Sequence, residues 1–273
     1  MTSKRSYSTL AFWACPIRQP SLVGGLAWRR IRLRFSGATL GWLWAVLIPL
    51  VMLAVYTFVF GTVFHRDWGS HLPETTNYAF HLYLVLVCYQ FLADCIGRSP
   101  GRIPENRTFV KKIVFPLEAL SWIAVLDALF SLLVNLCVLL VLNAIWFGAP
   151  GISVLQLPLA LVPLVMLGLG VSWLFAAIGA YFRDLRQVSG LLVGLLLFAT
   201  PIFYPLDAVP EPYRAMLLAN PLTGIVDAAR DILFLDGVES WPVVGMLWAG
   251  TTVFASLSHA LFMRLRRGFA DVV

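Results

Sequence analysis

The chain has 273 residues, of which 60% are hydrophobic and only 12% are charged. A soluble globular domain carries about 25% charged residues, so this composition excludes an ordinary soluble protein. The net charge of +6 would suit a nucleic-acid partner, yet the basic residues gather at the ends of long apolar runs, as they do in membrane proteins. We therefore expect a membrane protein without a nucleic-acid partner.

The N-terminal region, residues 1–36, is expected to be a retained cytoplasmic tail followed by a helix on the membrane surface. Its first apolar run is too short for the core of a signal peptide. On a helix over residues 22–35, Trp28, Ile31 and Phe35 share one face and arginines cover the rest, a pattern typical of a basic amphipathic helix at an interface. The alternative is a charged flank that anchors the first span.

Six apolar segments within residues 37–267 predict an all-α integral membrane protein with six transmembrane helices. The first span, Trp42–Phe64, has 23 residues without a charged side chain. As a helix it would be about 34 Å long, enough to cross the hydrocarbon layer of a bilayer. The other five spans are predicted at Tyr78–Gly97, Leu117–Phe147, Leu157–Phe182, Val188–Tyr204 and Trp241–Met263.

The distribution of basic residues predicts the orientation of these spans. With a cytoplasmic N-terminus, 17 of the 20 Lys and Arg lie on the inner side, as the positive-inside rule requires. Six spans then return the chain to the cytoplasm, where the short C-terminal segment 268–273 ends. We expect a multi-pass protein with both termini cytoplasmic.

Motifs for catalysis are missing from the sequence. There is no G-x-x-x-x-G-K-[ST] phosphate loop for ATP, and the four histidines are not paired at metal-ligand spacing. The four cysteines show neither zinc-ligand spacing nor a disulfide framework. We expect a chain that is not itself an enzyme, with no catalytic residues, no metal site and no cofactor of its own.

Short motifs extend along most of the chain. They are R-x-R-x-R-F-x-G-x-x-L-G-x-L-W from Arg30, V-Y-T-F-V-F-G from Val55, E-N-R-x-x-V-K-K-x-x-F-P from Glu105, Y-F-R-D-L-R-Q at 181–187, P-I-F-Y-P from Pro201 and N-P-L at 220–222. In this order, with six spans, the chain resembles the membrane (permease) subunit of ATP-binding-cassette exporters for lipid-linked polysaccharides, namely O-antigen, teichoic acid and capsule.

The resemblance implies a homodimer in the inner membrane, with two copies of a separate ATPase subunit docked beneath it. ATP and Mg²⁺ would bind to that subunit. In this family the N-terminal helix and the inner loops contact the ATPase, and residues 105–113 are expected to form a short helix parallel to the membrane. The implied coupling residues are Arg29, Arg30, Arg34, Glu105, Asn106, Arg107, Arg183, Asp184 and Arg186.

The implied cargo is undecaprenyl-linked polysaccharide, foremost O-antigen. The alternatives are teichoic acid or capsule, or a small molecule or lipid moved by an exporter of the same superfamily. A membrane-embedded transferase is the alternative from another class. It would work without an ATPase and would need polar catalytic groups clustered at one interface, and the sequence shows no convincing cluster.

After the fifth span, residues 205–235 correspond to short re-entrant helices on the outer side in this family.

Aromatic side chains are candidates for the path of a sugar polymer. Sugar rings present apolar C–H faces, and a sliding polymer needs weak, repeated contacts rather than one tight site. Tyr56 and Phe60 share one face of the first span at i and i+4 spacing. The alternative is that such residues sit at membrane interfaces or face lipid. The predicted conduit residues are Tyr56, Phe60, Tyr83, Tyr89, Phe198 and Tyr204.

Three polar residues lie in apolar surroundings. Asp94 is expected to pair with Arg98, four residues further on, and Asn135 to bond to a neighbouring helix. Asp127 is costly within a span, so it is expected to face protein or water; the alternative is a position at the membrane interface.

Overall fold

In the computed structural model, the regular secondary structure of the described residues is entirely helical. No strand occurs in the described part of the chain, which comprises residues 19–63, 78–108, 115–148, 151–204, 209–235, 237–238 and 240–272. Within these ranges, 5 helices are long and apolar enough to cross a membrane, and one shorter apolar helix accompanies them. The predicted all-α membrane fold with about six spans is therefore confirmed.

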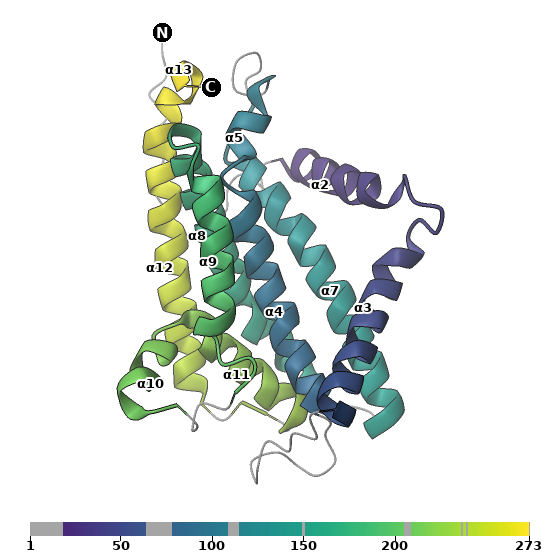
Figure 1. The fold of residues 1–273 in the computed structure, drawn as a ribbon. Helices are drawn as coiled ribbons and strands as arrows, with labels where there is room; N and C mark the ends of the chain where they lie inside the picture. Colours follow the sequence, from purple (N-terminus) through teal and green to yellow (C-terminus); the bar gives the residue numbers. More distant parts are fainter. Residues whose placement is uncertain are drawn as a thin grey trace.

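The spans run side by side, with shorter helices at both ends of the bundle (Figure 1). The spans are α3 Leu43–Tyr56, α4 Tyr78–Arg98, α7 Ala119–Phe147, α8 Leu157–Tyr181, α9 Leu185–Ala199 and α12 Trp241–Leu265. The shorter elements are α2 Pro20–Phe35, α5 Arg102–Glu105, α10 Glu211–Leu218, α11 Pro221–Phe234, α13 Phe269–Val272 and the 3₁₀ segments Ile152–Gln156 and Arg266–Gly268.

The helices α4 and α8 form the centre of the bundle. In their most apolar windows, 83% of the α4 residues and 72% of the α8 residues are buried. Small residues allow α8 to approach its neighbours closely. A Cβ added at Gly170 would lie 2.6 Å from the ring of Phe254 on α12, and one added at Gly179 would lie 2.5 Å from the backbone of Pro100.

The first predicted span is not one continuous α-helix. It begins at Leu43, but the α-helix ends at Tyr56 and a π-helix continues over Thr57–Val63. Pro49 lies inside α3, where it lacks the backbone N–H that the helix ladder needs. The Thr57 hydroxyl donates to the Leu53 carbonyl at 2.8 Å. Such local departures from α-geometry often occur at functional sites.

The fifth span is short, as predicted, but lies three to five residues earlier in the chain than expected. It begins at Leu185, within the loop predicted after the fourth span, with Asp184 at the N-cap position. It ends at Ala199 because Thr200 is extended, with φ −111° and ψ 134°. Thr200 precedes a proline, which disfavours the helical conformation of the residue before it.

The helix α2 lies across one end of the bundle, at a steep angle to the spans (Figure 1). Its buried side chains are Val23, Ala27, Ile31 and Phe35, spaced four residues apart along one face. The predicted apolar face was partly wrong, because Trp28 is 55% exposed. Instead, Trp28 stacks on Trp42 just before α3, with ring centroids 5.5 Å apart.

Two short helices follow α9 at the opposite end of the bundle, where re-entrant helices were predicted (Figure 1). The helix α11 packs into the bundle with eight buried residues, whereas α10 has none. Asn220 caps α11, its side chain accepting a hydrogen bond from the Leu222 N–H at 3.1 Å. The depth of these helices in the membrane stays a prediction.

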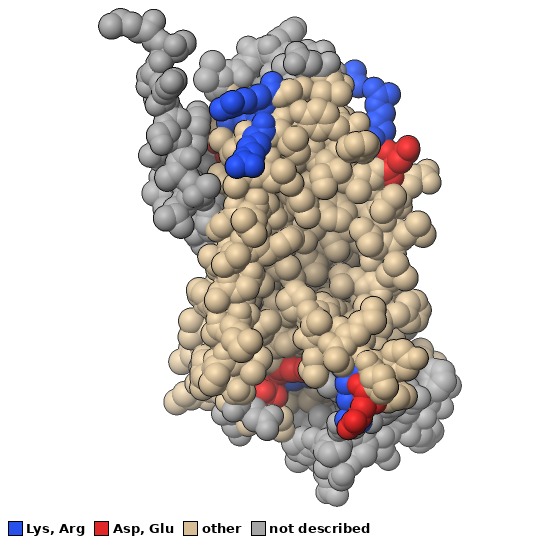
Figure 2. All heavy atoms as spheres, turned by 90° about the vertical axis from the view of Figure 1, so that its left-hand side faces the viewer, with Lys and Arg blue, Asp and Glu red and all other residues tan. Residues whose placement is uncertain are grey.

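Charged side chains gather at the two ends of the molecule. On the face drawn in Figure 2, Lys, Arg, Asp and Glu occur near the top and the bottom, and the broad band between them holds none. We call the end with α2, α5 and α13 the basic end. An uncharged band between two charged ends is what a bilayer requires of a protein that crosses it.

Candidate functional site

The two inner loops of the sequence meet at the basic end. Arg186 Nη2 lies 2.7 Å from Glu105 Oε1, which joins α5 to the start of α9. A hollow of about 310 Å³ adjoins this pair and is lined by Pro100, Pro104, Arg107, Gly179, Arg183 and Arg186. Residues that lie about 80 positions apart in the sequence thus form one surface.

This surface is open to solvent. The side chains of Glu105 and Arg186 are 58% and 59% exposed, and Arg183 and Asp184 are exposed beside them. An exposed ion pair contributes about 0–1 kcal/mol to stability. The fold therefore depends little on this pair.

The helix predicted over residues 105–113 is tested only at its start, where residues 107 and 108 are helical but Glu105 belongs to a separate short helix. The helix α5 covers Arg102–Glu105, and Asn106 leaves helical geometry with φ −109° and ψ 39°. The side chain of Asn106 donates from Nδ2 to the Arg102 carbonyl at 2.8 Å, which satisfies a carbonyl left open at the helix end. Residues 109–114 lie outside the described residues, so that part of the expectation is not tested.

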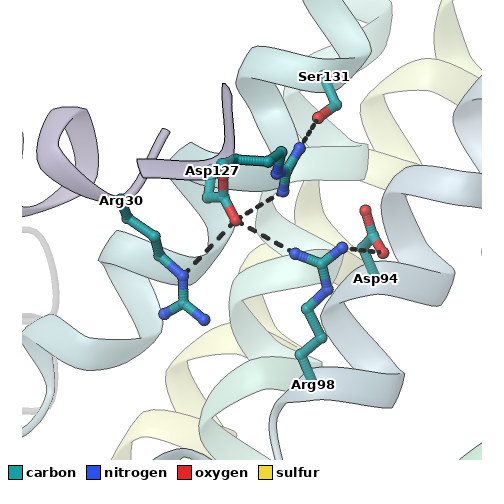
Figure 3. Close-up of polar contacts among 6 residues, drawn as sticks. Arg30, Asp94, Arg98, Asp127 and Ser131 are labelled. Carbon is teal, nitrogen blue, oxygen red and sulfur yellow. Dashed lines mark hydrogen bonds and ion pairs between the residues drawn. The ribbon is translucent and has the colours of Figure 1, made fainter. Parts of the chain in front are cut away.

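A second polar group lies where α2 crosses α7 and the end of α4. The carboxylate of Asp127 is 2% exposed, and its Oδ2 atom faces three guanidinium groups (Figure 3). Arg34 Nη2 lies at 2.9 Å, Arg98 Nη1 at 3.3 Å and Arg30 Nε at 3.7 Å. Arg34 also donates to the Ser131 hydroxyl at 2.8 Å. We call this group the Asp127 clasp.

The clasp bears on two of the expectations. Asp127 faces protein, where it has the cationic partners that a buried carboxylate needs; the alternative of a position at the membrane interface is not tested. The local pair of Asp94 with Arg98 is confirmed at 3.1 Å. Arg30 and Arg34 were predicted to contact an ATPase, but their side chains bind Asp127 within the chain. Arg29 is exposed, and a contact of all three with an ATPase stays a prediction.

A cleft of about 460 Å³ runs along α4 between α3, α7 and α9. Its polar lining comes from Gln90, Asp94, Ser131 and Asn135 as well as from tyrosines. The expectation that Asn135 bonds to a neighbouring helix is confirmed, because its Oδ1 accepts from the Tyr83 hydroxyl at 2.6 Å.

The cleft brings together half of the predicted conduit residues. Tyr56, Tyr83 and Tyr89 line it, but Tyr83 and Tyr89 are only 2% and 8% exposed. The Tyr89 hydroxyl donates to the Val193 carbonyl at 2.9 Å. These two tyrosines therefore fix α4 to α7 and α9 and offer little free ring surface. Tyr56, half-buried, presents the most ring surface of the three.

The other predicted conduit residues lie outside the cleft lining. Phe60 stacks on Phe203, which lines the cleft, with ring centroids 6.2 Å apart. Phe198 is 67% exposed on α9, and the Tyr204 hydroxyl donates to the Phe198 carbonyl at 2.7 Å. Gln90, which is exposed in the cleft, was missed by the sequence interpretation. An amide in an apolar span was the signal that would have found it.

The helical spans and the uncharged band define an integral membrane protein with a cleft between its helices. A family model gives its class: residues 21–234 match the ABC-2 type transporter. The chain therefore belongs to the ABC-2 type transporter family, as a transmembrane transport subunit.

Individual relatives cover nearly the whole chain. It is 27% identical over 244 residues to the O-antigen export system permease protein RfbA of Klebsiella pneumoniae, covering 89% of this chain and 91% of the relative. It is 30% identical over 250 residues to the polysialic acid transport protein KpsM of Escherichia coli, covering 89% and 93%. Similarity to the daunorubicin resistance permease DrrB1 of Streptomyces coeruleorubidus is 26% over 231 residues, covering 81% and 78%.

Proposed function

We propose that this chain is the transmembrane subunit of an ATP-driven exporter that moves undecaprenyl-linked polysaccharide, foremost O-antigen, across the inner membrane. The observation that carries the proposal is the cleft along α4, which combines an aromatic ring with polar groups over much of the span. The similarity to permeases named for O-antigen export and polysialic acid transport supports the same class of cargo.

The cleft has the chemistry that a sliding sugar polymer needs. Tyr56 offers a ring face to the C–H face of a sugar, and Gln90 and Ser131 offer hydrogen bonds to hydroxyl groups. Each of these contacts is weak and none of them encloses a sugar. A repeating polymer can therefore exchange one unit for the next with a low barrier.

The energy is proposed to come from a separate ATPase subunit with bound ATP and Mg²⁺. Its docking surface is the hollow beside the Glu105–Arg186 pair, and we infer that the basic end faces the cytoplasm. Within the described part of the chain, a Cβ added at Gly190 of α9 would meet nothing within 4 Å, and apolar side chains of α3 and α9 are exposed. These faces are proposed to meet a second copy of the chain, so that two clefts form one conduit.

Two measurements test the proposal. The first is co-purification from the native membrane followed by an ATPase assay, and we expect a nucleotide-binding subunit in stoichiometric amount. The second is deletion of the gene, after which we expect undecaprenyl-linked glycan to accumulate inside the cell and surface glycan to fall.

Unchanged surface glycan with no lipid-linked intermediate would overturn the polysaccharide assignment. If an ATPase still co-purifies in that case, the export of a small molecule or lipid becomes the better assignment, which the similarity to DrrB1 would then favour. A chain that purifies without any ATPase would instead favour a membrane-embedded transferase.

A further inference from the structure

The Asp127 clasp contains more positive than negative charge. Arg30, Arg34 and Arg98 face Asp127, and Asp94 pairs with Arg98. A fourth guanidinium, that of Arg102, lies within electrostatic range of Arg30, Arg98 and Asp127. This part of the basic end thus contains four cationic groups and only two carboxylates.

Arg102 is the unusual member of this group. It is only 2% exposed, and its Nε and Nη1 atoms have no hydrogen-bond partner among the residues that the structure describes. Burial, followed by the charges of Arg30 and Arg98, lowers the pKa of the Arg102 guanidinium to about 10. It is still a cation at neutral pH. A buried cation with unmade hydrogen bonds is costly, so an anion that reaches these two nitrogen atoms would be bound favourably.

We propose that Arg30, Arg34, Arg98 and Arg102 form a binding site for the phosphate of a lipid headgroup. The planar fork of a guanidinium matches phosphate oxygens and makes two parallel hydrogen bonds to them. The site lies where the spans end and α2 crosses them (Figures 1 and 3), which is where lipid phosphates are found.

The position of the site relative to the cleft gives it a role. Asp94 and Ser131 bond to arginines of the site and also line the cleft. A headgroup held by the arginines therefore places whatever is attached to its phosphate at the mouth of the cleft. The site requires only a phosphate-bearing lipid, so it does not rest on the proposed polysaccharide cargo.

The test measures lipid retention by the full chain, purified with any subunits that accompany it. Native mass spectrometry follows the release of undecaprenyl diphosphate, phosphatidylglycerol and diacylglycerol, which has no phosphate. We expect the two phosphate lipids to be retained and Arg102→Gln to weaken their binding about tenfold, as expected for a lost charge-assisted hydrogen bond. The affinity of Arg102→Lys for these lipids should lie between those of the wild type and Arg102→Gln, because lysine keeps the charge but lacks the planar guanidinium.

Arg267→Gln is the matched control. Arg267 is exposed at the same end of the molecule and its loss changes the net charge equally, but it lies outside the site; this variant should bind like the wild type. Equal effects of Arg102→Gln and Arg267→Gln, or equal retention of diacylglycerol and phosphate lipids by the wild type, would overturn the proposal.

The supporting outcomes identify the source of the phosphate. Retention of undecaprenyl diphosphate alone indicates the carrier of a cargo, and retention of both phosphate lipids indicates general anionic lipid. Displacement of both by inorganic pyrophosphate indicates that the phosphate group suffices. If Arg102→Gln fails to fold, hydrogen exchange on the wild type decides: phosphatidylglycerol should slow exchange in residues 98–106 relative to diacylglycerol, and no difference would refute the site.

Discussion

Replacing Asp127 with Asn should loosen α2 from the rest of the bundle. The change removes the negative charge at 2.9, 3.3 and 3.7 Å from three guanidinium groups. Breaking a fully buried ion pair in this way costs about 3–5 kcal/mol. The arginine side chains are 32–43% exposed, so water compensates part of the loss. We expect a cost of about 2 kcal/mol.

This cost can be measured locally and globally. Hydrogen exchange in α2 should become about 30-fold faster, since 1.4 kcal/mol corresponds to a factor of ten. Unfolding in mixed detergent micelles, carried out on Asp127→Asn, Arg34→Gln and the double variant, gives the coupling energy between the two side chains. We expect at least about 1 kcal/mol.

The control is Asp94→Asn, which removes an i,i+4 pair and should cost no more than about 0.5 kcal/mol. A coupling energy below about 0.5 kcal/mol between Asp127 and Arg34 lies within ordinary additivity and would refute the clasp as a stabilising contact. Unchanged exchange in α2 would refute its role in holding that helix.

Three further predictions concern the docking surface, the packing of α8 and the cleft. Glu105→Arg should lower the ATPase activity of the complex several-fold, and a second change, Arg186→Glu, should restore it. The stability of the chain should change little, because an exposed ion pair contributes about 0–1 kcal/mol. Unchanged ATPase activity would remove Glu105 from coupling. Gly179→Ala should destabilise the chain by about 1–3 kcal/mol through overpacking. Gly245→Ala on α12, where an added Cβ meets no described atom within 4 Å, should be neutral or stabilising by up to about 1 kcal/mol; equal unfolding midpoints of the two variants would contradict this. Tyr56→Ala should slow polymer export about three- to tenfold, the loss of roughly 1 kcal/mol of ring contact, and export at the wild-type rate would exclude it from the conduit.

The two inner loops show which part of a surface the sequence can place. Glu105 lies in one short polar loop between long apolar spans, and Arg183 and Arg186 lie in another. The two loops had to lie at the same end of the bundle. That much follows from the number of spans between them. The 2.7 Å contact of Glu105 with Arg186 depends on how α8 and α9 pack, which no local pattern records.

Two tyrosines that were predicted to line the conduit show what the sequence does not reveal. The sequence places Tyr83 and Tyr89 in the second span, but α4 lies at the centre of the bundle and buries both rings. Hydroxyl contacts with Asn135 and the Val193 carbonyl then turn them into supports for the cleft wall. Only the position of α4 among its neighbours separates these residues from the half-buried Tyr56.

The sequence by itself determined the membrane class, the approximate spans and the separation of basic and apolar segments. These properties are local, because a helix must be long and apolar enough to cross hydrocarbon wherever it lies in the fold. The tertiary structure decided which charges meet. Arg34 and Asp127 are 93 residues apart in the chain, and they bind because α2 crosses α7, where a buried carboxylate is stable only beside cations.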